Sequence, residues 1–340
     1  MSCFHPMHGF VIGKTDSGKD KYQIESGEVT WVHPLDRNGN RDISRFVREF
    51  IEIPCGKCIG CRLDYSKEWA TRCMLEAKQY KHNAFITLTY DNENIKLNKG
   101  INRETGEIEL VGNLVPNDLT NFMKKLRRHW EYNYGEKNIR FYACGEYGSN
   151  TFRPHYHIIC FNIDIPDLKY FFTNKSGDKT YTSEIIEKIW GKGIVSIGEV
   201  TWNSAAYTAR YVMKKIKGKN AKEQYEEMGI LPEFVRMSRK PGIARNFYED
   251  NKEKIYLTDE VIVTNKNGLA MKAKPSKYFD RLYDLDSPEA MEAIKKARKE
   301  RAEIADIIRA TKTSLSKEEY LLQKEEITNR KLKKLKRVGI

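Results

Sequence analysis

The sequence predicts an α+β fold built around an antiparallel sheet. Short segments rich in β-branched and aromatic residues, typical of buried strands, alternate with longer segments whose apolar residues recur every three or four positions, typical of helices. Their order is strand, helix, strand, strand, helix, strand, helix, which matches a split βαβ pattern. The 340 residues are 40% hydrophobic and 31% charged, a balance that supports a buried core. We therefore expect a sheet of about five strands with helices on one face.

The individual elements follow from these patterns. Expected strands lie at 50–53, 85–90, 139–144, 155–161 and 194–200. Expected helices lie at 63–80, at 117–130, in a short segment that ends before Gly191, and at 203–216. Asn117 is expected to be the N-cap of the second helix because it follows Pro116 and precedes an apolar stripe.

Composition divides the chain into three regions. Residues 1–75 hold a cysteine-rich segment and the first helix, residues 76–280 hold the predicted sheet, and residues 281–340 form a charged, helix-favouring tail. The last 50 residues contain 15 Lys and Arg against 8 Asp and Glu. We expect a basic helical tail there.

Net charge narrows the class of partner. The chain has 60 Lys and Arg against 47 Asp and Glu, a net charge of +13, and this excess favours nucleic acid. No apolar run approaches the roughly 18 residues that span a bilayer. The start, MSCFHPMHGF, lacks the basic and apolar regions of a signal peptide. These observations exclude membrane and secreted classes and predict no membrane partner.

Four basic residues of the second helix suit phosphate contacts, although a solvated helix face is the alternative interpretation. They are Lys124, Lys125, Arg127 and Arg128.

Three cysteines are spaced for a metal site. Cys55, Cys58 and Cys61 place three thiolates in one turn-rich segment, and tetrahedral Zn²⁺ needs a fourth N or S ligand. Cys3 is the first candidate, with His5 and His8 as rivals. An iron–sulfur cluster is less favoured, because the spacing to the next cysteine does not match a ferredoxin motif. We expect structural zinc and a reducing compartment.

A second metal site is indicated by two histidines on one strand. His155 and His157 are two residues apart, so on a strand they project from the same face and form a pair of ligands for a divalent metal. Glu146 follows the preceding strand and is a candidate third ligand. The alternatives are histidines that pack on the sheet and a surface glutamate.

Two tyrosines are candidate nucleophiles. On a helix, Tyr207, Tyr211 and Lys215 are spaced i, i+4 and i+8 and would share one face, with Lys214 beside them. Lysine ammonium groups would stabilise a phenolate or the negative charge of a transition state. Aromatic residues at helical spacing are more often part of a core.

Three segments, taken together, resemble the ordered motifs of HUH endonucleases, the rolling-circle replication initiators. They are FITLTYD (85–91), RPHYH (153–157) and YTARYVMKK (207–215). The sequence is most similar to the initiators of small single-stranded-DNA phages, the Microviridae of gokushovirus type, over about residues 50–250, including CGKCIGCR (55–62). The resemblance implies a ferredoxin-like HUH endonuclease domain at 76–280, a metal held by His155 and His157 with Glu146 as a further ligand, and two tyrosines that attack and return DNA phosphate.

The expected function is a site-specific single-stranded-DNA endonuclease and strand transferase that uses Mg²⁺ or Mn²⁺. It would form a 5′-phosphotyrosine link and so start and end rolling-circle replication. Tyr211 is favoured as first nucleophile because it lies nearer Lys214 and Lys215, and Arg153 is expected to contact DNA. Thr87 and Thr89 share a strand face, either as strand-forming residues or as DNA contacts.

The expected partners are the origin of single-stranded or supercoiled circular DNA and the replication polymerase and helicase of a bacterial host, in whose cytoplasm the protein would act. A plasmid relaxase or a transposase would share the chemistry. A non-catalytic, zinc-containing nucleic-acid-binding protein is the alternative from another class.

Overall fold

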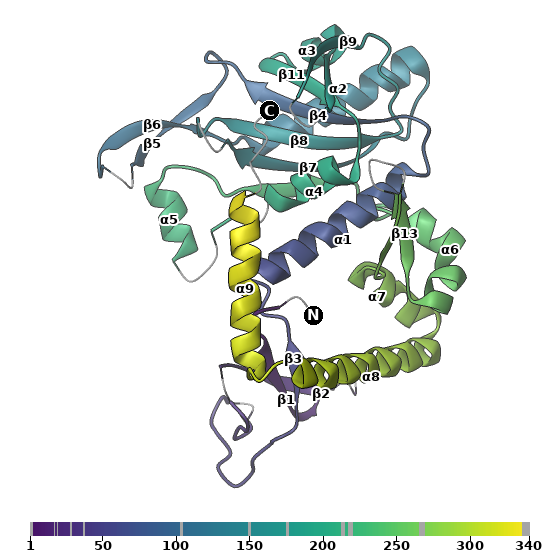
Figure 1. The fold of residues 1–340 in the computed structure, drawn as a ribbon. Helices are drawn as coiled ribbons and strands as arrows, with labels where there is room; N and C mark the ends of the chain where they lie inside the picture. Colours follow the sequence, from purple (N-terminus) through teal and green to yellow (C-terminus); the bar gives the residue numbers. More distant parts are fainter. Residues whose placement is uncertain are drawn as a thin grey trace. The chain divides into compact units, whose positions relative to one another are not determined.

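The computed structural model divides the chain into two compact units (Figure 1). One combines Met1–Asp64 with Ala302–Lys336, and the other contains Tyr65–Arg301. The structure describes residues 3–16, 18, 20–27, 29–36, 38–102, 105–148, 151–174, 177–211, 215–216, 220–264 and 269–334. The boundaries between the units fall inside α1 (Ile59–Ala77) and α8 (Pro288–Lys312).

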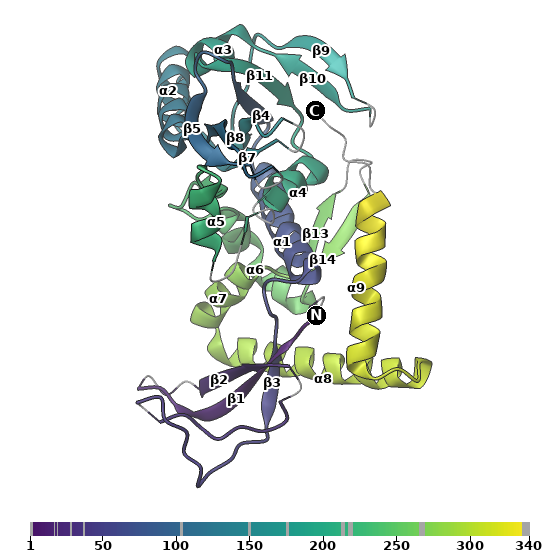
Figure 2. The same cartoon turned by 90° about the vertical axis from the view of Figure 1, so that its left-hand side faces the viewer.

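The first unit, which we call the cysteine unit, is built from both ends of the chain. Its strands are β1 (Met7–Lys14), β2 (Asp20–Ser26) and β3 (Phe50–Ile53), and β1 pairs with both neighbours in an antiparallel sheet (Figure 2). Helix α9 (Lys317–Lys334) joins them through two ion pairs, His5–Glu325 at 2.6 Å and Lys317–Glu52 at 2.7 Å. Residues more than 250 positions apart in sequence therefore stabilise one another here.

The second unit, the sheet unit, contains a larger antiparallel sheet. Within the described part of the chain it has seven strands in the order β12-β7-β8-β4-β11-β10-β9. Their bounds are β4 Asn83–Tyr90, β7 Arg140–Tyr147, β8 Pro154–Phe161, β9 Lys169–Thr173, β10 Lys179–Thr182, β11 Gly193–Gly198 and β12 Phe234–Met237. The α+β class and the antiparallel sheet are confirmed, and the strands beyond the expected five are short.

The four central strands have the predicted topology. In chain order β4, β7, β8 and β11 are first to fourth, and the sheet order β7-β8-β4-β11 places β8 between β4 and β7, and β4 between β8 and β11. Each inserted strand runs antiparallel to its neighbours. Helix α2 (Pro116–Tyr134) connects β4 to β7, and α3 (Glu184–Trp190) connects β8 to β11, which makes two interlocked split βαβ units.

Helices cover both faces of this sheet, so the prediction of helices on one face was wrong. The crossover helices α2 and α3 pack on one face in a core that includes Trp130, Ile158 and Trp190. The other face packs against α1 and α4 (Trp202–Tyr211) in a core that includes Tyr142 and Ile159. Figure 1 shows α4 and α1 beside β7, away from α2 and α3. The two faces therefore have separate cores.

The remaining elements surround the sheet. Two hairpins, β5 (Lys96–Ile101) with β6 (Ile108–Asn113) and β13 (Val261–Thr264) with β14 (Ala270–Ala273), form separate two-stranded sheets. Helices α5 (Ala221–Glu227), α6 (Arg245–Thr258) and α7 (Lys277–Asp286) complete the unit. Of the helices in the described residues, each is too short or too polar to cross a bilayer.

Two predicted helix ends were wrong. Helix α2 begins at Pro116 with Val115 as N-cap, and Asn117 does not cap it, because proline at the first position removes an N–H that would need a partner. Helix α4 ends at Tyr211, and Lys215 and Ile216 are not helical. The predicted divisions after residues 75 and 280 remain predictions, and the compact units group the tail with the N-terminal segment.

Candidate active site and metal centre

Three adjacent strands bring the candidate residues of the sheet unit together. Across β8 and β4, His155 pairs with Thr89 and His157 pairs with Thr87. Across β8 and β7, His155 pairs with Glu146. Directly paired residues project from the same face of a sheet, so these side chains form one polar group on the face covered by α1 and α4.

The two histidines are held in the same way. Thr87 Oγ1 lies 3.0 Å from Nδ1 of His157, and Thr89 Oγ1 lies 2.9 Å from Nδ1 of His155. Nε2 of His157 lies 3.0 Å from Oε1 of Glu146, and both of these side chains are 3% exposed. Because Nδ1 of each ring contacts a threonine, Nε2 is the nitrogen through which each ring could bind a metal.

This donor set fits a divalent cation. Two imidazole nitrogens with one carboxylate leave coordination positions open for substrate oxygens. The ring centroids of His155 and His157 are 6.3 Å apart, and the three ligand groups are more widely spaced than the four thiols of the cysteine unit. The chemistry of the donors and their common face together make His155, His157 and Glu146 the candidate catalytic metal ligands.

Tyr207 lies beside these ligands. Its ring centroid is 5.2 Å from that of His157 in an edge-on arrangement. Helix α4 reaches the sheet closely because small residues, Ala205, Ala206 and Ala209, face the core at helical spacing. Ser66 Oγ of α1 donates a hydrogen bond to the Ala206 carbonyl at 2.9 Å and fixes α4 against α1.

The other predicted catalytic residues are placed less fully. The Tyr211 backbone ends α4, while the Tyr211 side chain and all of Lys214 lie outside the described residues. Lys215 is not in the helix, so the prediction that it shares a helix face with Tyr207 was wrong.

The predicted DNA-contacting residues fall into two groups. Arg127 and Arg153 bind the protein itself: Arg127 Nε donates to the Ile139 carbonyl at 3.0 Å, and Arg153 donates to the Tyr90 carbonyl at 2.7 Å. Lys124, Lys125 and Arg128 lie at the surface of α2. Since α2 packs on the face opposite α4, the structure does not bring these surface residues to the histidine pair.

The hydroxyls that hold the histidines were not assigned a role from sequence. Thr87 and Thr89 were interpreted as strand-forming residues or DNA contacts, and the structure instead places them against His157 and His155. The sequence did carry an indication: Thr-x-Thr and His-x-His have the same period of two on strands expected in one sheet.

The cysteine unit holds a second candidate metal centre. Ligand atoms of Cys3, Cys55, Cys58 and Cys61 all lie within 4.8 Å of one another. Sulfur pairs are 3.9 Å apart for Cys3–Cys58 and 4.0 Å apart for Cys55–Cys61. In a tetrahedral site with Zn–S bonds of about 2.3 Å the sulfurs are about 3.8 Å apart. The cluster therefore fits zinc, and Cys3 is the fourth ligand that the geometry supports.

The rival histidines make other contacts. His5 Nε2 lies 2.6 Å from Glu325, and His8 Nδ1 lies 2.7 Å from the Val29 carbonyl while its ring stacks on Phe50. Both side chains are held away from the role of fourth ligand.

Backbone N–H groups favour deprotonated thiols in the cluster. Burial raises the pKa of the Cys3 and Cys61 thiols. Burial also acts to raise the pKa of Cys55, but N–H groups of Cys58 and Lys57 outweigh it and lower that pKa to about 7. Metal binding needs the thiolate, so a low pKa at one ligand favours loading near neutral pH.

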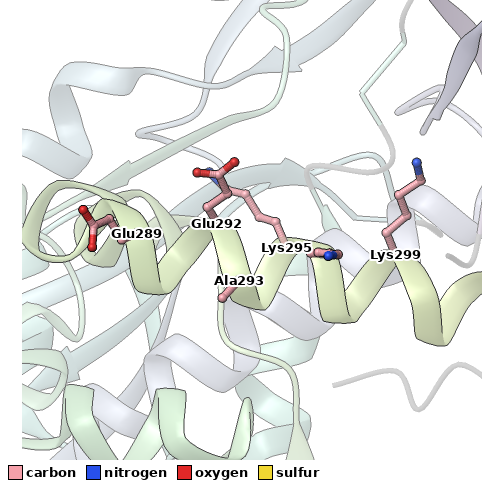
Figure 3. Close-up of a pocket in the computed structure, with 6 residues that line it drawn as sticks. Glu289, Glu292, Ala293, Lys295 and Lys299 are labelled. Carbon is pink, nitrogen blue, oxygen red and sulfur yellow. The ribbon is translucent and has the colours of Figure 1, made fainter.

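A hollow elsewhere in the sheet unit has no comparable chemistry. Six residues of α8, among them Glu289, Glu292, Lys295 and Lys299, line it, and Figure 3 shows them along that single helix. Lys295 is paired with Asp284 at 2.8 Å. Mixed charges on one exposed helix do not form a catalytic site.

Comparison with known proteins agrees with this geometry. A family model of replication-associated proteins of the ORF2 type matches residues 83–216, the segment that contains the histidine pair and Tyr207. The chain is 35% identical over 99% of its length to "Replication-associated protein ORF2" of Spiroplasma virus 4, covering 98% of that protein. It is 30% identical over 79% of its length to "Replication-associated protein VP4" of Bdellovibrio phage phiMH2K, covering 79% of that protein.

A shorter match covers 55% of the chain and 44% of "Replication-associated protein ORF4" of Chlamydia phage 1, at 31% identity. No solved structure matches the chain. The extent of the first two similarities shows that the chain belongs to the family of phage replication-associated proteins.

Proposed function

We propose that this chain starts and ends rolling-circle replication as a DNA nicking and joining enzyme with an HUH-type sheet. The observation that carries the proposal is the position of the Tyr207 ring, 5.2 Å from His157, next to a histidine pair and a carboxylate on one sheet face. A nucleophile beside a divalent-metal site is the arrangement that phosphodiester transfer needs. Membership of a replication-associated family supports DNA as substrate.

The proposed reaction is a transfer of one phosphodiester bond. Tyr207 Oη attacks the scissile phosphorus, the bond from phosphorus to the 3′-oxygen breaks, and a 5′-phosphotyrosine forms. The phenol proton is balanced by the proton that the leaving 3′-oxygen takes up to become a hydroxyl. A bound Mg²⁺ or Mn²⁺ would supply Lewis-acid stabilisation of the phosphate oxygens. Since the phosphotyrosine retains the energy of the phosphodiester, attack by a 3′-hydroxyl rejoins the strand without ATP.

Two tyrosines give the enzyme a second nucleophile for termination. After one round of synthesis the enzyme must cut the new strand while it is still bonded to the old one. The position of the Tyr207 ring beside His157 favours Tyr207 for the first attack, in place of the order expected from the lysines. Tyr211 would then act in the return reaction. The free 3′-hydroxyl would be extended by a host polymerase, with a host helicase, in the bacterial cytoplasm.

The cysteine unit is proposed to hold structural zinc. Four thiols within 4.8 Å of one another form a closed set of ligands, which suits a metal that supports folding and has no substrate position. Lys124, Lys125 and Arg128 would contact DNA phosphates away from the metal.

One experiment separates nicking from binding. The full chain is incubated with an end-labelled single strand carrying the origin of its own genome, with Mn²⁺ or Mg²⁺, and resolved under denaturing conditions. A covalent protein–DNA adduct that EDTA prevents supports the enzyme. A shift seen only in native gels, without adduct under any metal condition, contradicts the proposal and favours a non-catalytic DNA-binding protein.

A further inference from the structure

Two threonines on one strand match two histidines on the next. Thr87 and Thr89 of β4 lie directly across from His157 and His155 of β8. Each hydroxyl reaches the Nδ1 of its paired ring, at 3.0 Å and 2.9 Å. Two equal contacts in successive register positions indicate one structural device used twice.

Burial makes the contact at His157 the stronger constraint. Thr87 is 6% exposed and the His157 side chain 3% exposed, so water competes poorly for the imidazole nitrogen. Phe85 stacks on His157 at 5.7 Å and restricts rotation of the ring further. A β-branched threonine on a strand has few side-chain rotamers, so its hydroxyl stays in place.

A hydroxyl suits both tautomers of the histidine opposite. It can donate to Nδ1 when Nε2 carries a proton that Glu146 accepts, 3.0 Å away. It can also accept from Nδ1–H when Nε2 binds a cation. A valine of the same shape can do neither, and would leave Nδ1–H unpaired in the metal-bound form.

We propose that Thr87 and Thr89 are positioning residues for the catalytic metal: through Nδ1 they fix the orientation and tautomer of His157 and His155 so that both Nε2 atoms face the cation. This inference rests on the proposed function, because it assumes that the histidine pair binds a divalent metal. It assigns the Thr-x-Thr pattern of β4 a task in metal binding in place of DNA contact.

The test measures metal affinity apart from catalysis. Mn²⁺ binding to the zinc-loaded full chain is followed by electron paramagnetic resonance for wild type, Thr87→Val, Thr89→Val and the double variant. Removal of such supporting hydrogen bonds typically weakens metal binding by about 10–100-fold, and we expect a decrease in that range for the double variant. Thr87→Ser with Thr89→Ser keeps both hydroxyls and should remain within about threefold of wild type.

A matched control separates positioning from general strand effects. Thr180→Val lies on β10, which β11 separates from β4, and should bind Mn²⁺ as wild type does. If the valine variants keep their melting temperature and bind Mn²⁺ as tightly as wild type, the positioning role is overturned. If His157→Ala and His155→Ala also leave Mn²⁺ binding unchanged, the metal assignment of the proposed function fails instead.

A measurement on the wild-type chain covers the case in which the buried Thr87→Val variant does not fold. Imidazole nitrogen-15 spectra with Mg²⁺ should show His155 and His157 protonated at Nδ1. Protonation at Nε2 in the Mg²⁺-bound chain would overturn the proposal without any variant.

Discussion

The two candidate metal centres differ in how the chain assembles them. In the cysteine unit three ligands come from the short segment between Cys55 and Cys61, and only Cys3 is distant in sequence. In the sheet unit the ligands come from β7 and β8, and their supporting hydroxyls come from β4. The first centre depends on local spacing, whereas the second depends on strand register.

The dependence on register has a physical consequence. Successive side chains on a strand point to opposite faces, so a slip of one residue between β4 and β8 would turn both threonines away from the histidines. The cysteine cluster is less sensitive, because several of its N–H···S hydrogen bonds join residues two or three positions apart, as in Lys57 and Cys58 to Cys55.

The donor atoms differ as well. Thiolates favour soft or borderline metals such as zinc, and imidazole with carboxylate accepts Mn²⁺ or Mg²⁺ with open positions. The two centres should therefore respond independently to substitution, and nicking rate with zinc content measured together can break or sharpen that comparison.

The largest effect on nicking is expected when both nucleophiles are removed. Tyr207→Phe with Tyr211→Phe should form no covalent adduct, since no phenol remains to attack phosphorus, and zinc content should stay unchanged. Each single variant should retain some nicking but lose efficient release of closed circles. Peptide mapping of the DNA-linked residue is the measurement, and Tyr132→Phe, at a site 88% exposed on α2, is the control. Adduct on one residue alone in every background would contradict a two-nucleophile mechanism.

Removal of a catalytic metal ligand should have the next largest effect. His157→Ala should lower the nicking rate by about 10³-fold, equivalent to about 4 kcal/mol of transition-state stabilisation. DNA affinity should change little, because phosphate contacts do not pass through the metal. His82→Ala, at an exposed position, is the control. A near wild-type rate for His157→Ala would remove it from the ligand set.

The zinc centre should respond in the opposite pattern. The purified chain should carry about one zinc per molecule, and Cys58→Ser should release it and destabilise the cysteine unit, since structural zinc contributes folding energy directly. Nicking by the sheet unit should fall by less than about tenfold. Metal analysis and a thermal melt provide the measurement. Cys160→Ala, in the buried core of β8, should keep the zinc. Iron with inorganic sulfide in place of zinc would contradict the assignment.

The smallest effect is expected on the exposed face of α2. Lys124→Ala with Lys125→Ala should weaken DNA binding at any sequence and reduce the slope of log affinity against log salt by about one for each lysine that binds a phosphate. The nicking rate at saturating DNA should not change. Lys254→Ala, exposed on α6, is the control. An unchanged salt slope would show that these lysines face solvent only.

The parts of the fold that follow from local pattern were predictable. Residues with high strand propensity located β4 and β8, and their order along the chain indicated the split βαβ topology. The short strands β9, β10 and β12 carry little apolar pattern of their own, because a strand near the margin of a sheet is only partly buried. The end of α4 was also missed, since the Lys-rich continuation has good intrinsic helix propensity.

The candidate sites were predictable to the extent that their ligands share a pattern. The Cys55–Cys61 spacing and the His-x-His spacing both indicated metal ligands. The choice of Cys3 over His5 depends on the ion pair between His5 and Glu325, 320 residues away, which no local pattern contains. The roles of Thr87 and Thr89 likewise depend on which strand lies beside β4.

The union of both chain ends in one compact unit has a consequence for synthesis. Residues 65–301 are complete before α9 leaves the ribosome, so the sheet with its histidines can form while the cysteine unit still lacks its last helix. The ion pairs of Glu325 with His5 and of Lys317 with Glu52 can close only after translation of the tail. A premature stop near the start of α9 would therefore leave the sheet unit whole and injure the beginning of the protein.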